Sequence, residues 1–281
     1  MLALVAAACN NGSTQAAGGS PSPHGSMKMS ESPSMGMSAS PAMSHGMMQP
    51  GADKMHAKIT SPKPGTLLTG NTLDLHIVTS GYTDTCATAG KPDMAGMGHY
   101  HVLLDGALVN MFCTPTAKIS MQNVSSGQHT IEVVPAQDDH TEITANAFKM
   151  PFTYQPKNPL PTVGAASSTG TPSIKILQPK TGATLSGNFT VKVAFQSFHP
   201  SCNLMGKPDV AGYGHWHANL DSMSGPMMGM GTMIGMSCTP VFHGTTQGLT
   251  PGSKHTLITL LTDNNHAPLD ISDTITFTVG T

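Results

Sequence analysis

The sequence predicts an all-β protein in which two tandem immunoglobulin-like β-sandwich domains follow a disordered Met- and His-rich segment. One residue pattern occurs twice, and short β-branched or alternating runs are separated by Gly, Pro and Asn turns throughout both copies. Several short strands in about 100 residues, with one Cys pair per copy, are typical of an immunoglobulin-like sandwich. We therefore expect repeat 1 at residues 58–154, a linker at 155–172 and repeat 2 at 173–281.

The first nine residues resemble the end of a bacterial lipoprotein signal peptide. Residues 1–8 are apolar and mostly small, and Cys9 follows them where a lipid would be attached. The run is short and has no basic region before it, so we expect the true start codon to lie upstream. No apolar run of the sequence approaches the roughly 20 residues that a membrane-spanning helix needs. The prediction is an extracytoplasmic lipoprotein, anchored to the membrane through Cys9, in the periplasm or at the cell surface.

Four cysteines remain once Cys9 is set aside, one pair in each repeat at matching positions. We predict the disulfides Cys86–Cys113 and Cys202–Cys238. Disulfides persist in oxidising compartments, in agreement with export, and each would stabilise a small domain by about 2–4 kcal/mol. Thiolate metal sites are the alternative, but the sequence has no CxxC spacing.

Residues 10–57 consist mainly of Ser, Gly, Pro, Ala, Met and His. Such a segment cannot bury enough apolar area to offset chain entropy, so we predict a disordered tether. Thioether sulfur selects Cu(I), and imidazole accepts copper in either oxidation state. We interpret the dense Met and His content as a means of capturing copper. The alternative is a spacer in which Met is merely tolerated.

A second Met cluster lies in a Gly-rich insertion that repeat 1 lacks. The Gly content argues against a buried helix, so we expect an exposed, flexible loop whose thioethers bind Cu(I). The alternative is an adaptable apolar loop that docks a partner protein. The candidate metal ligands of this loop are Met227, Met228, Met230, Met233 and Met236.

The same His-bearing strand occurs in both repeats, as Gly98–Asp105 and Gly214–Asp221. Because side chains alternate across a strand, the aromatic and aliphatic residues should face the core and the two histidines the opposite side. Imidazoles at positions i and i+2 can share one metal ion. Alternatively, the histidines bond loops and the strand-end aspartates to fix the fold. The candidate metal ligands are His99, His101, His129 and His140 in repeat 1 and His215, His217, His255 and His266 in repeat 2.

With these motifs the repeats resemble a bacterial all-β domain family of unknown function, whose members carry a GHxHLLID-like strand and a later GxHTLxLxLxDxxHxP-like segment. The motifs are Gly98–Asp105 with Gly127–His140, and Gly214–Asp221 with Gly252–Pro268. The resemblance covers most of both repeats. It implies the fold and the set of histidines but no activity.

A looser resemblance is to periplasmic immunoglobulin-like copper carriers, which combine His ligands for Cu(II) with a Met-rich loop for Cu(I). It implies copper as the bound ion, with zinc as the second choice, and a metal-receiving protein as a partner. Copper/zinc superoxide dismutase also places an HxH strand in a β-sandwich. That likeness leaves a superoxide dismutase-like redox enzyme as a third possible function.

Composition and motifs exclude several other classes of protein. Charged residues make up only 10% of the chain and its net charge is -2, without the basic block that binds a phosphate backbone, so we expect no nucleic acid partner. GxSxG, HExxH and phosphate-binding Gly-loop motifs are missing from the sequence, so we predict a protein that is not an enzyme. The predicted function is to buffer or deliver copper outside the cytoplasm. The alternative is a non-enzymatic cell-surface adhesion or ligand-binding module.

Overall fold

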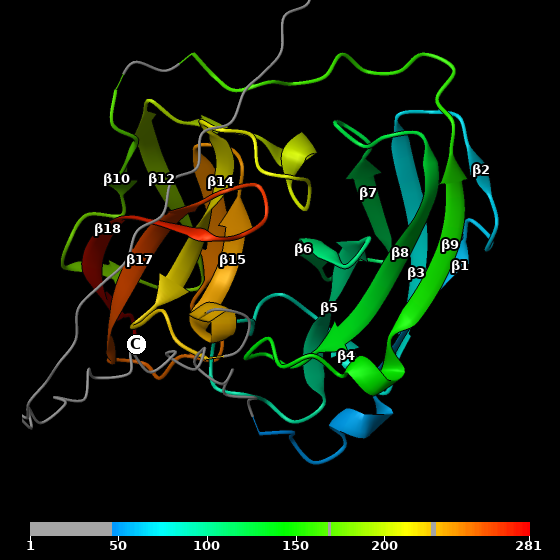
Figure 1. Cartoon of the computed structure of the whole chain (residues 1–281). Helices are drawn as coiled ribbons and strands as arrows, with labels where there is room; N and C mark the ends of the chain where they lie inside the picture. Colours follow the sequence, from blue (N-terminus) through cyan, green and yellow to red (C-terminus); the bar gives the residue numbers. More distant parts are fainter. Residues whose placement is uncertain (1–46, 168–169, 226–228) are drawn as a thin grey trace, which may run out of the picture. The chain divides into compact units, whose positions relative to one another are not determined.

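The computed structural model describes residues 47–167, 170–225 and 229–281, and their regular structure is almost entirely β (Figure 1). These residues fall within one compact unit. The predicted all-β class is therefore confirmed. Cys9 and most of the predicted tether lie outside the described residues, as do Met227 and Met228. Among the described residues, no helix has the length and apolar character required to cross a membrane.

Repeat 1 is a sandwich of two sheets whose buried faces share one apolar core. The smaller sheet has the order β1-β3-β7, and the larger has the order β2-β9-β8-β5-β4 with β6 paired to β5. Leaving aside the two-residue strands β2 and β4, the strands of the smaller sheet are the first, second and fifth in the chain. Immunoglobulin-like domains place these three strands in one sheet. The strands are β1 (His56–Ser61), β2 (Leu67–Leu68), β3 (Thr72–Ser80), β4 (Thr83–Asp84), β5 (Met97–Leu104), β6 (Ala107–Phe112), β7 (Thr116–Ser120), β8 (Gly127–Ala136) and β9 (Phe148–Tyr154).

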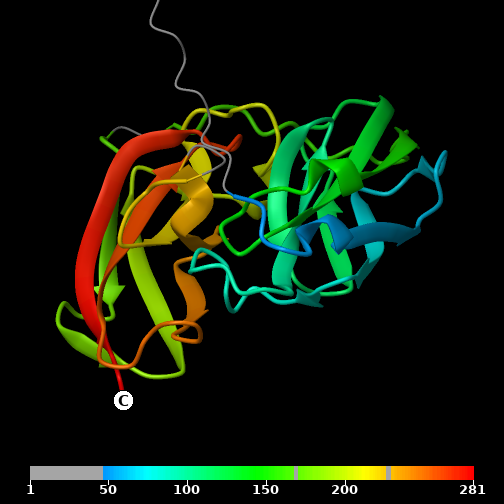
Figure 2. The same ribbon diagram turned by 90° about the horizontal axis from the view of Figure 1, so that it is seen from below.

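Repeat 2 reproduces this arrangement strand for strand, with the orders β10-β12-β16 and β11-β18-β17-β14-β13 and with β15 paired to β14. Its strands are coloured from yellow-green to red in Figure 2. Its strands are β10 (Ser173–Gln178), β11 (Ala183–Leu185), β12 (Asn188–Gln196), β13 (His199–Pro200), β14 (Tyr213–Leu220), β15 (Met233–Ser237), β16 (Val241–Thr245), β17 (Lys254–Thr262) and β18 (Pro268–Val279). The described 3-10 turns are η1 (Ala52–Lys54), η2 (Thr144–Asn146), η3 (Cys202–Leu204) and η4 (Met230–Thr232).

Packed residues precede the predicted start of repeat 1. Ala52 and Met55, which the sequence assigned to the tether, are buried in a small apolar cluster with Ile143. Burial of these side chains offsets the cost of ordering the segment. Between the repeats, residues 155–167 and 170–172 contain no strand.

The two His-bearing strands have the predicted faces. In β5, Tyr100, Val102 and Leu104 point into the core of repeat 1, and in β14 Trp216 and Ala218 do the same in repeat 2. The histidines therefore lie on the outer face of the larger sheet, because neighbouring side chains alternate. They are nevertheless buried, which requires other parts of the chain to cover that face.

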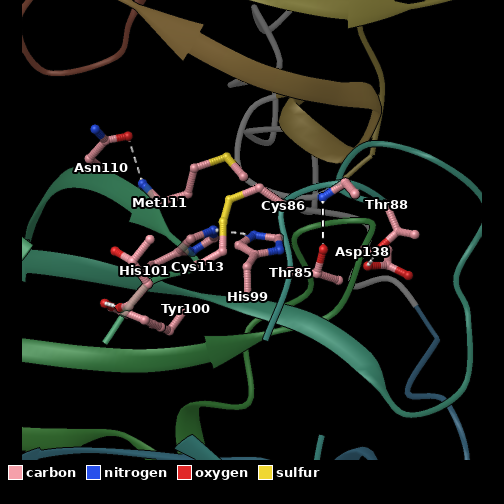
Figure 3. Close-up of a disulfide and its surroundings, with 12 residues drawn as sticks. Thr85, Cys86, Thr88, His99, Tyr100, His101, Asn110, Met111, Cys113 and Asp138 are labelled. Atoms are coloured by element: carbon pink, nitrogen blue, oxygen red, sulfur yellow. Dashed lines mark hydrogen bonds between the residues drawn. A yellow bond between two sulfur atoms is a disulfide. The ribbon is translucent and has the colours of Figure 1, made fainter. Parts of the chain in front are cut away.

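Both predicted disulfides are present. The Cα atoms are 5.6 Å apart in Cys86–Cys113 and 5.2 Å apart in Cys202–Cys238. Each joins a loop that precedes the His-bearing strand to the end of the strand that follows it, so it fixes the surroundings of the histidines (Figure 3). Because disulfides persist in oxidising compartments, they indicate that these domains lie outside the cytoplasm.

The outer faces of the two larger sheets contact each other. Lys91 Nζ donates hydrogen bonds across this contact to the carbonyl oxygens of Thr245 and Gln247, at 2.7 and 2.6 Å. Gly90 and its counterpart Gly206 both have positive φ, and a Cβ atom at either would collide with backbone of the other repeat. We call the apolar residues at this contact the inter-repeat cluster: Ala89, Leu108 and Met111 from repeat 1 and Met230 and Met233 from repeat 2, with Cys86 and Met236 packed against them.

Candidate metal centres

Three predicted histidines of repeat 1 converge on one point, which we call triad 1. His99 Nε2 lies 3.1 Å from His101 Nε2 and 3.1 Å from His140 Nδ1, and the last two atoms are 3.2 Å apart. All three side chains are buried, with at most 1% of each residue exposed. The three ring nitrogens therefore form a nearly equilateral triangle in a site that excludes solvent.

Local structure explains how residues distant in sequence meet here. The pleat of β5 places His99 and His101 on one face, and the pairing of His99 with Ala136 brings the end of β8 beside them. A tight turn follows, in which the backbone N–H of His140 donates to the carbonyl of Gln137. His140 adopts a φ of 63°, an uncommon conformation for a residue other than Gly. This turn directs its imidazole back over the strand.

In two imidazoles of triad 1, the ring nitrogen that points away from the triad is hydrogen-bonded to an oxygen acceptor. His140 Nε2 lies 2.8 Å from the carbonyl oxygen of Met233, and His101 Nδ1 lies 2.8 Å from Glu142 Oε1. We assign the hydrogens from these partners, because a carbonyl or carboxylate oxygen only accepts. Each of these imidazoles, when neutral, therefore directs a lone pair into the triad. The two lone pairs face each other across 3.2 Å.

Neither His140 nor His99 readily supplies a proton that would relieve this repulsion near neutral pH. Burial lowers the pKa of His140 to about 3 and that of His99 well below its usual range, with nearby imidazoles as the second cause. A neutral His99 has a single N–H and cannot fully satisfy two acceptors. Its Nδ1 has no hydrogen-bond partner among the described residues. A metal cation bound by all three nitrogens would satisfy both lone pairs at once.

Repeat 2 forms the same arrangement, triad 2, from His215 and His217 of β14 and His266 of the turn after β17. The distances are 3.0 Å between the two Nε2 atoms of the β14 pair, 2.9 Å from His215 Nε2 to His266 Nδ1, and 3.4 Å from His217 Nε2 to the same atom. His266 also has positive φ, at 67°. Burial lowers the pKa of His266 to about 4 and those of the β14 pair well below their usual range.

The surroundings of the two triads differ. The residue two positions after the third histidine is Glu142 in repeat 1 and Pro268 in repeat 2, which has no carboxylate to orient His217. Instead, His217 and His266 line a cavity of about 320 Å³ together with Met223, Met230 and Pro268. His266 Nε2 has no well-formed hydrogen bond among the described residues, although the nearby backbone of Leu108 and Val109 favours its charged form.

Both triads fit a transition-metal ion. Zinc lies about 2.0–2.1 Å from each imidazole nitrogen, so two ligands of a tetrahedral ion are about 3.3 Å apart, close to the distances in both triads. Three neutral imidazoles suit zinc, copper, iron or nickel. Each triad also provides fewer than four ligands, which leaves a position for another group.

The other two predicted histidines lie outside the triads. His129 Nδ1 donates to Asp105 Oδ2 at 2.6 Å, and His255 Nδ1 donates to Asp221 Oδ2 at 2.7 Å. The second oxygen of each aspartate accepts from the backbone N–H of the residue after that histidine. These pairs brace the turn that follows each His-bearing strand, which is the structural alternative considered from the sequence.

The Met-rich insertion is less exposed than we expected. Met230 and Met233 are buried in the inter-repeat cluster, because the part of the insertion that contains them packs against repeat 1. Met223 is half exposed, and Met236 is partly buried. Sequence reasoning also missed Glu142, although its position two residues after His140 was visible, because repeat 2 has no equivalent carboxylate.

Comparisons with known proteins give little beyond these observations. No family model matches the chain, and no curated protein matches it. One similar solved structure is that of the fibronectin(III)-like modules of Clostridium thermocellum CbhA. It has 15% sequence identity, the match covers 80% of this chain and 94% of that one, and the TM-score is 0.26. Chicken CNTN1 FN1-FN3 domains have 9% identity, coverages of 78% and 65%, and a TM-score of 0.23.

A third similar structure, Dpr2 Ig1-Ig2 in complex with DIP-Theta Ig1-Ig3, has 10% identity, coverages of 80% and 98%, and a TM-score of 0.19. TM-scores this low carry no argument about this chain, so its fold class rests on its own strand order. The resemblance to the domain family of unknown function stays a prediction, as does metal binding by the predicted residues.

Proposed function

We propose that each repeat binds one transition-metal ion through its His triad and that the protein buffers or delivers copper outside the cytoplasm. The observation that carries this proposal is the geometry of triad 1. His101 Nε2 and His140 Nδ1 lie 3.2 Å apart, and the other nitrogen of each ring is hydrogen-bonded to an oxygen acceptor. When both rings are neutral, two lone pairs therefore face each other. The recurrence of the triangle in triad 2 supports it, because packing alone does not require three imidazole nitrogens to meet twice.

Copper is the ion that best accounts for the surroundings of the triads. Imidazole accepts Cu(I), Cu(II) and zinc, whereas thioether sulfur favours Cu(I). Met223 and Met230 line the same cavity as two histidines of triad 2, so thioethers lie close to that site. Zinc is the second choice, for triad 1 above all, where a carboxylate orients one imidazole as in many zinc sites.

An exported metal-binding protein also accounts for the rest of the chain. The disulfides suit an oxidising compartment. In this proposal, a lipid on Cys9 holds the protein at the membrane, the Met- and His-rich tether collects copper, and a metal-receiving protein takes it from the more accessible triad 2. Enzymatic activity has no part in this function.

The second candidate function is a non-enzymatic adhesion or ligand-binding module. The observation that favours it is the tandem immunoglobulin-like architecture, which serves recognition in many proteins. In that case the triads would be structural, and replacing their histidines would change stability without changing any metal content.

Metal analysis of the full chain after desalting distinguishes the two functions. The chain is loaded with Cu(II) or Zn(II), and we expect His99→Ala/His101→Ala and His215→Ala/His217→Ala each to lose one bound ion. The matched control is His129→Ala/His255→Ala, which removes two half-buried histidines that lie outside the triads and should retain both ions. Equal metal content in all three variants and the parent protein would contradict the proposal.

A further inference from the structure

Two methionines occupy equivalent positions beside the triads. Met111 of β6 lies directly opposite His101 of β5, and Met236 of β15 lies directly opposite His217 of β14. Side chains of directly opposed residues in antiparallel strands lie on the same face, with Cβ atoms about 4.5–5.5 Å apart. Each thioether therefore neighbours the second histidine of its own HxH strand.

The contact between the repeats brings these two methionines to one cleft. Both Met111 and Met236 belong to the inter-repeat cluster, and both line a cleft of about 540 Å³. Cys86 lines the same cleft, and Figure 3 shows Met111 extending toward its disulfide on the side of the sheet that carries His101. One thioether from each repeat thus faces a shared, partly open space.

The ammonium group of Lys91, which lines this cleft, is already hydrogen-bonded to backbone carbonyls. Lys91 Nζ donates to the carbonyl oxygens of Ala87, Thr245 and Gln247 at 2.5, 2.7 and 2.6 Å. Its positive charge disfavours a divalent cation in the cleft more than a monovalent one, since the repulsion scales with the charge of the ion. His243 lines the cleft as well and offers an additional imidazole.

Thioethers at two equivalent positions provide a soft donor set. Leucine would fill the same volume, but thioether sulfur selects Cu(I) among the biological metal ions. We propose that Met111 and Met236 together hold one monovalent soft cation, Cu(I), in the cleft between the repeats, at a site separate from both triads. This inference rests on the proposed metal-binding function, because the site lies where an ion could exchange with His101 or His217.

The test uses the full chain labelled with carbon-13 at the methionine methyl groups and titrated with Ag(I), a monovalent soft ion that is stable in air. We expect the methyl signals of Met111 and Met236 to shift together along one binding curve, whatever the tether methionines do. Signals that remain in place while tether signals shift would overturn the proposal. This readout comes from the unmodified protein and does not depend on any variant folding.

Variants then test whether the two sulfurs share one ion. In Met111→Leu, the Ag(I)-dependent shift of Met236 should be lost or weakened at least tenfold in Ag(I) concentration, and Met236→Leu should have the reciprocal effect on Met111. The matched control is Met150→Leu, which replaces a fully buried methionine in the core of repeat 1. An unchanged Met236 curve in Met111→Leu would overturn the shared site. Zn(II) retention by the triads, measured on the same samples, reports on the proposed function separately.

Discussion

Triad 1 and triad 2 have almost the same nitrogen geometry but different surroundings. The rings of both triads are buried. In triad 1, Glu142 and the carbonyl of Met233 hold the outer nitrogens of two imidazoles. In triad 2, Pro268 replaces the carboxylate, and two of the rings line a cavity with thioethers. Under the proposed function, this difference predicts that the triad of repeat 1 retains its ion longer than the triad of repeat 2 does.

The largest expected difference between the triads is in acid sensitivity of the metal-free protein. The pKa is lowered by burial for two histidines of triad 1 and for all three of triad 2. Below about pH 6.5 the unfolded chain binds protons that the folded chain does not, so the free energy of unfolding falls as pH falls. Each such histidine contributes at most about 1.4 kcal/mol per pH unit, a slope reached only between its unfolded and folded pKa values.

Denaturant unfolding of the metal-free chain at pH 6.5 and pH 5.5 measures this effect. The loss of stability over that interval should shrink more in His215→Gln/His217→Gln, which removes two histidines of lowered pKa, than in His99→Gln, which removes one. Equal losses in the two variants would contradict a difference between the triads.

Replacing Glu142 should lower the metal affinity of triad 1 and leave that of triad 2 unchanged. Glu142→Gln removes the carboxylate that orients His101, and loss of such a partner typically lowers metal affinity about 10–100-fold. Zinc competition titrations should show this loss in triad 1 and no change in triad 2. The converse change, Pro268→Glu, sharpens the comparison, because it should strengthen triad 2 if the carboxylate reaches His217.

The two triads should also differ in the rate at which a chelator removes their ions. The rings of both triads are buried, but a cavity lies beside His217 and His266 and gives a chelator a shorter route to triad 2. We expect EDTA to remove the triad 2 ion about tenfold faster, because ligand exchange at the enclosed site requires local opening of the chain. Stopped-flow release from each single-triad variant measures both rates, and equal rates would remove this distinction.

The smallest effect is expected at the two histidines outside the triads. His129→Ala and His255→Ala each remove a hydrogen bond to the aspartate of a strand-end turn, at a cost of about 1 kcal/mol in the free energy of unfolding. Metal content should not change in either variant. Loss of an ion would instead identify His129 or His255 as a ligand that reaches the metal by rearrangement.

Much of this arrangement was predictable because it is local or repeated. The alternation of side chains placed the HxH pair opposite Tyr100, and the matching of the two copies identified the cysteine pairs. The same matching singled out His140 and His266 as candidates. It could not separate them from His129 and His255, because all four recur equally and only the strand pairing determines which imidazoles reach the HxH face.

The remaining features depend on contacts between the repeats, about which local patterns carry no information. Met230 and Met233 were expected to be exposed but are buried against repeat 1. The carbonyl of Met233 in turn fixes the hydrogen of His140, a residue of the other repeat. A Gly-rich sequence indicates a flexible loop, but it does not reveal that a second domain covers it.

Anomalous X-ray diffraction from crystals of the metal-loaded full chain, recorded at the copper and zinc absorption edges, tests metal binding by the triads most directly. The expected result is one anomalous peak in each repeat, within bonding distance of His99, His101 and His140 in one and of His215, His217 and His266 in the other. Loaded crystals without a peak at either triad, or with peaks only elsewhere, would contradict the assignment of these histidines as metal ligands.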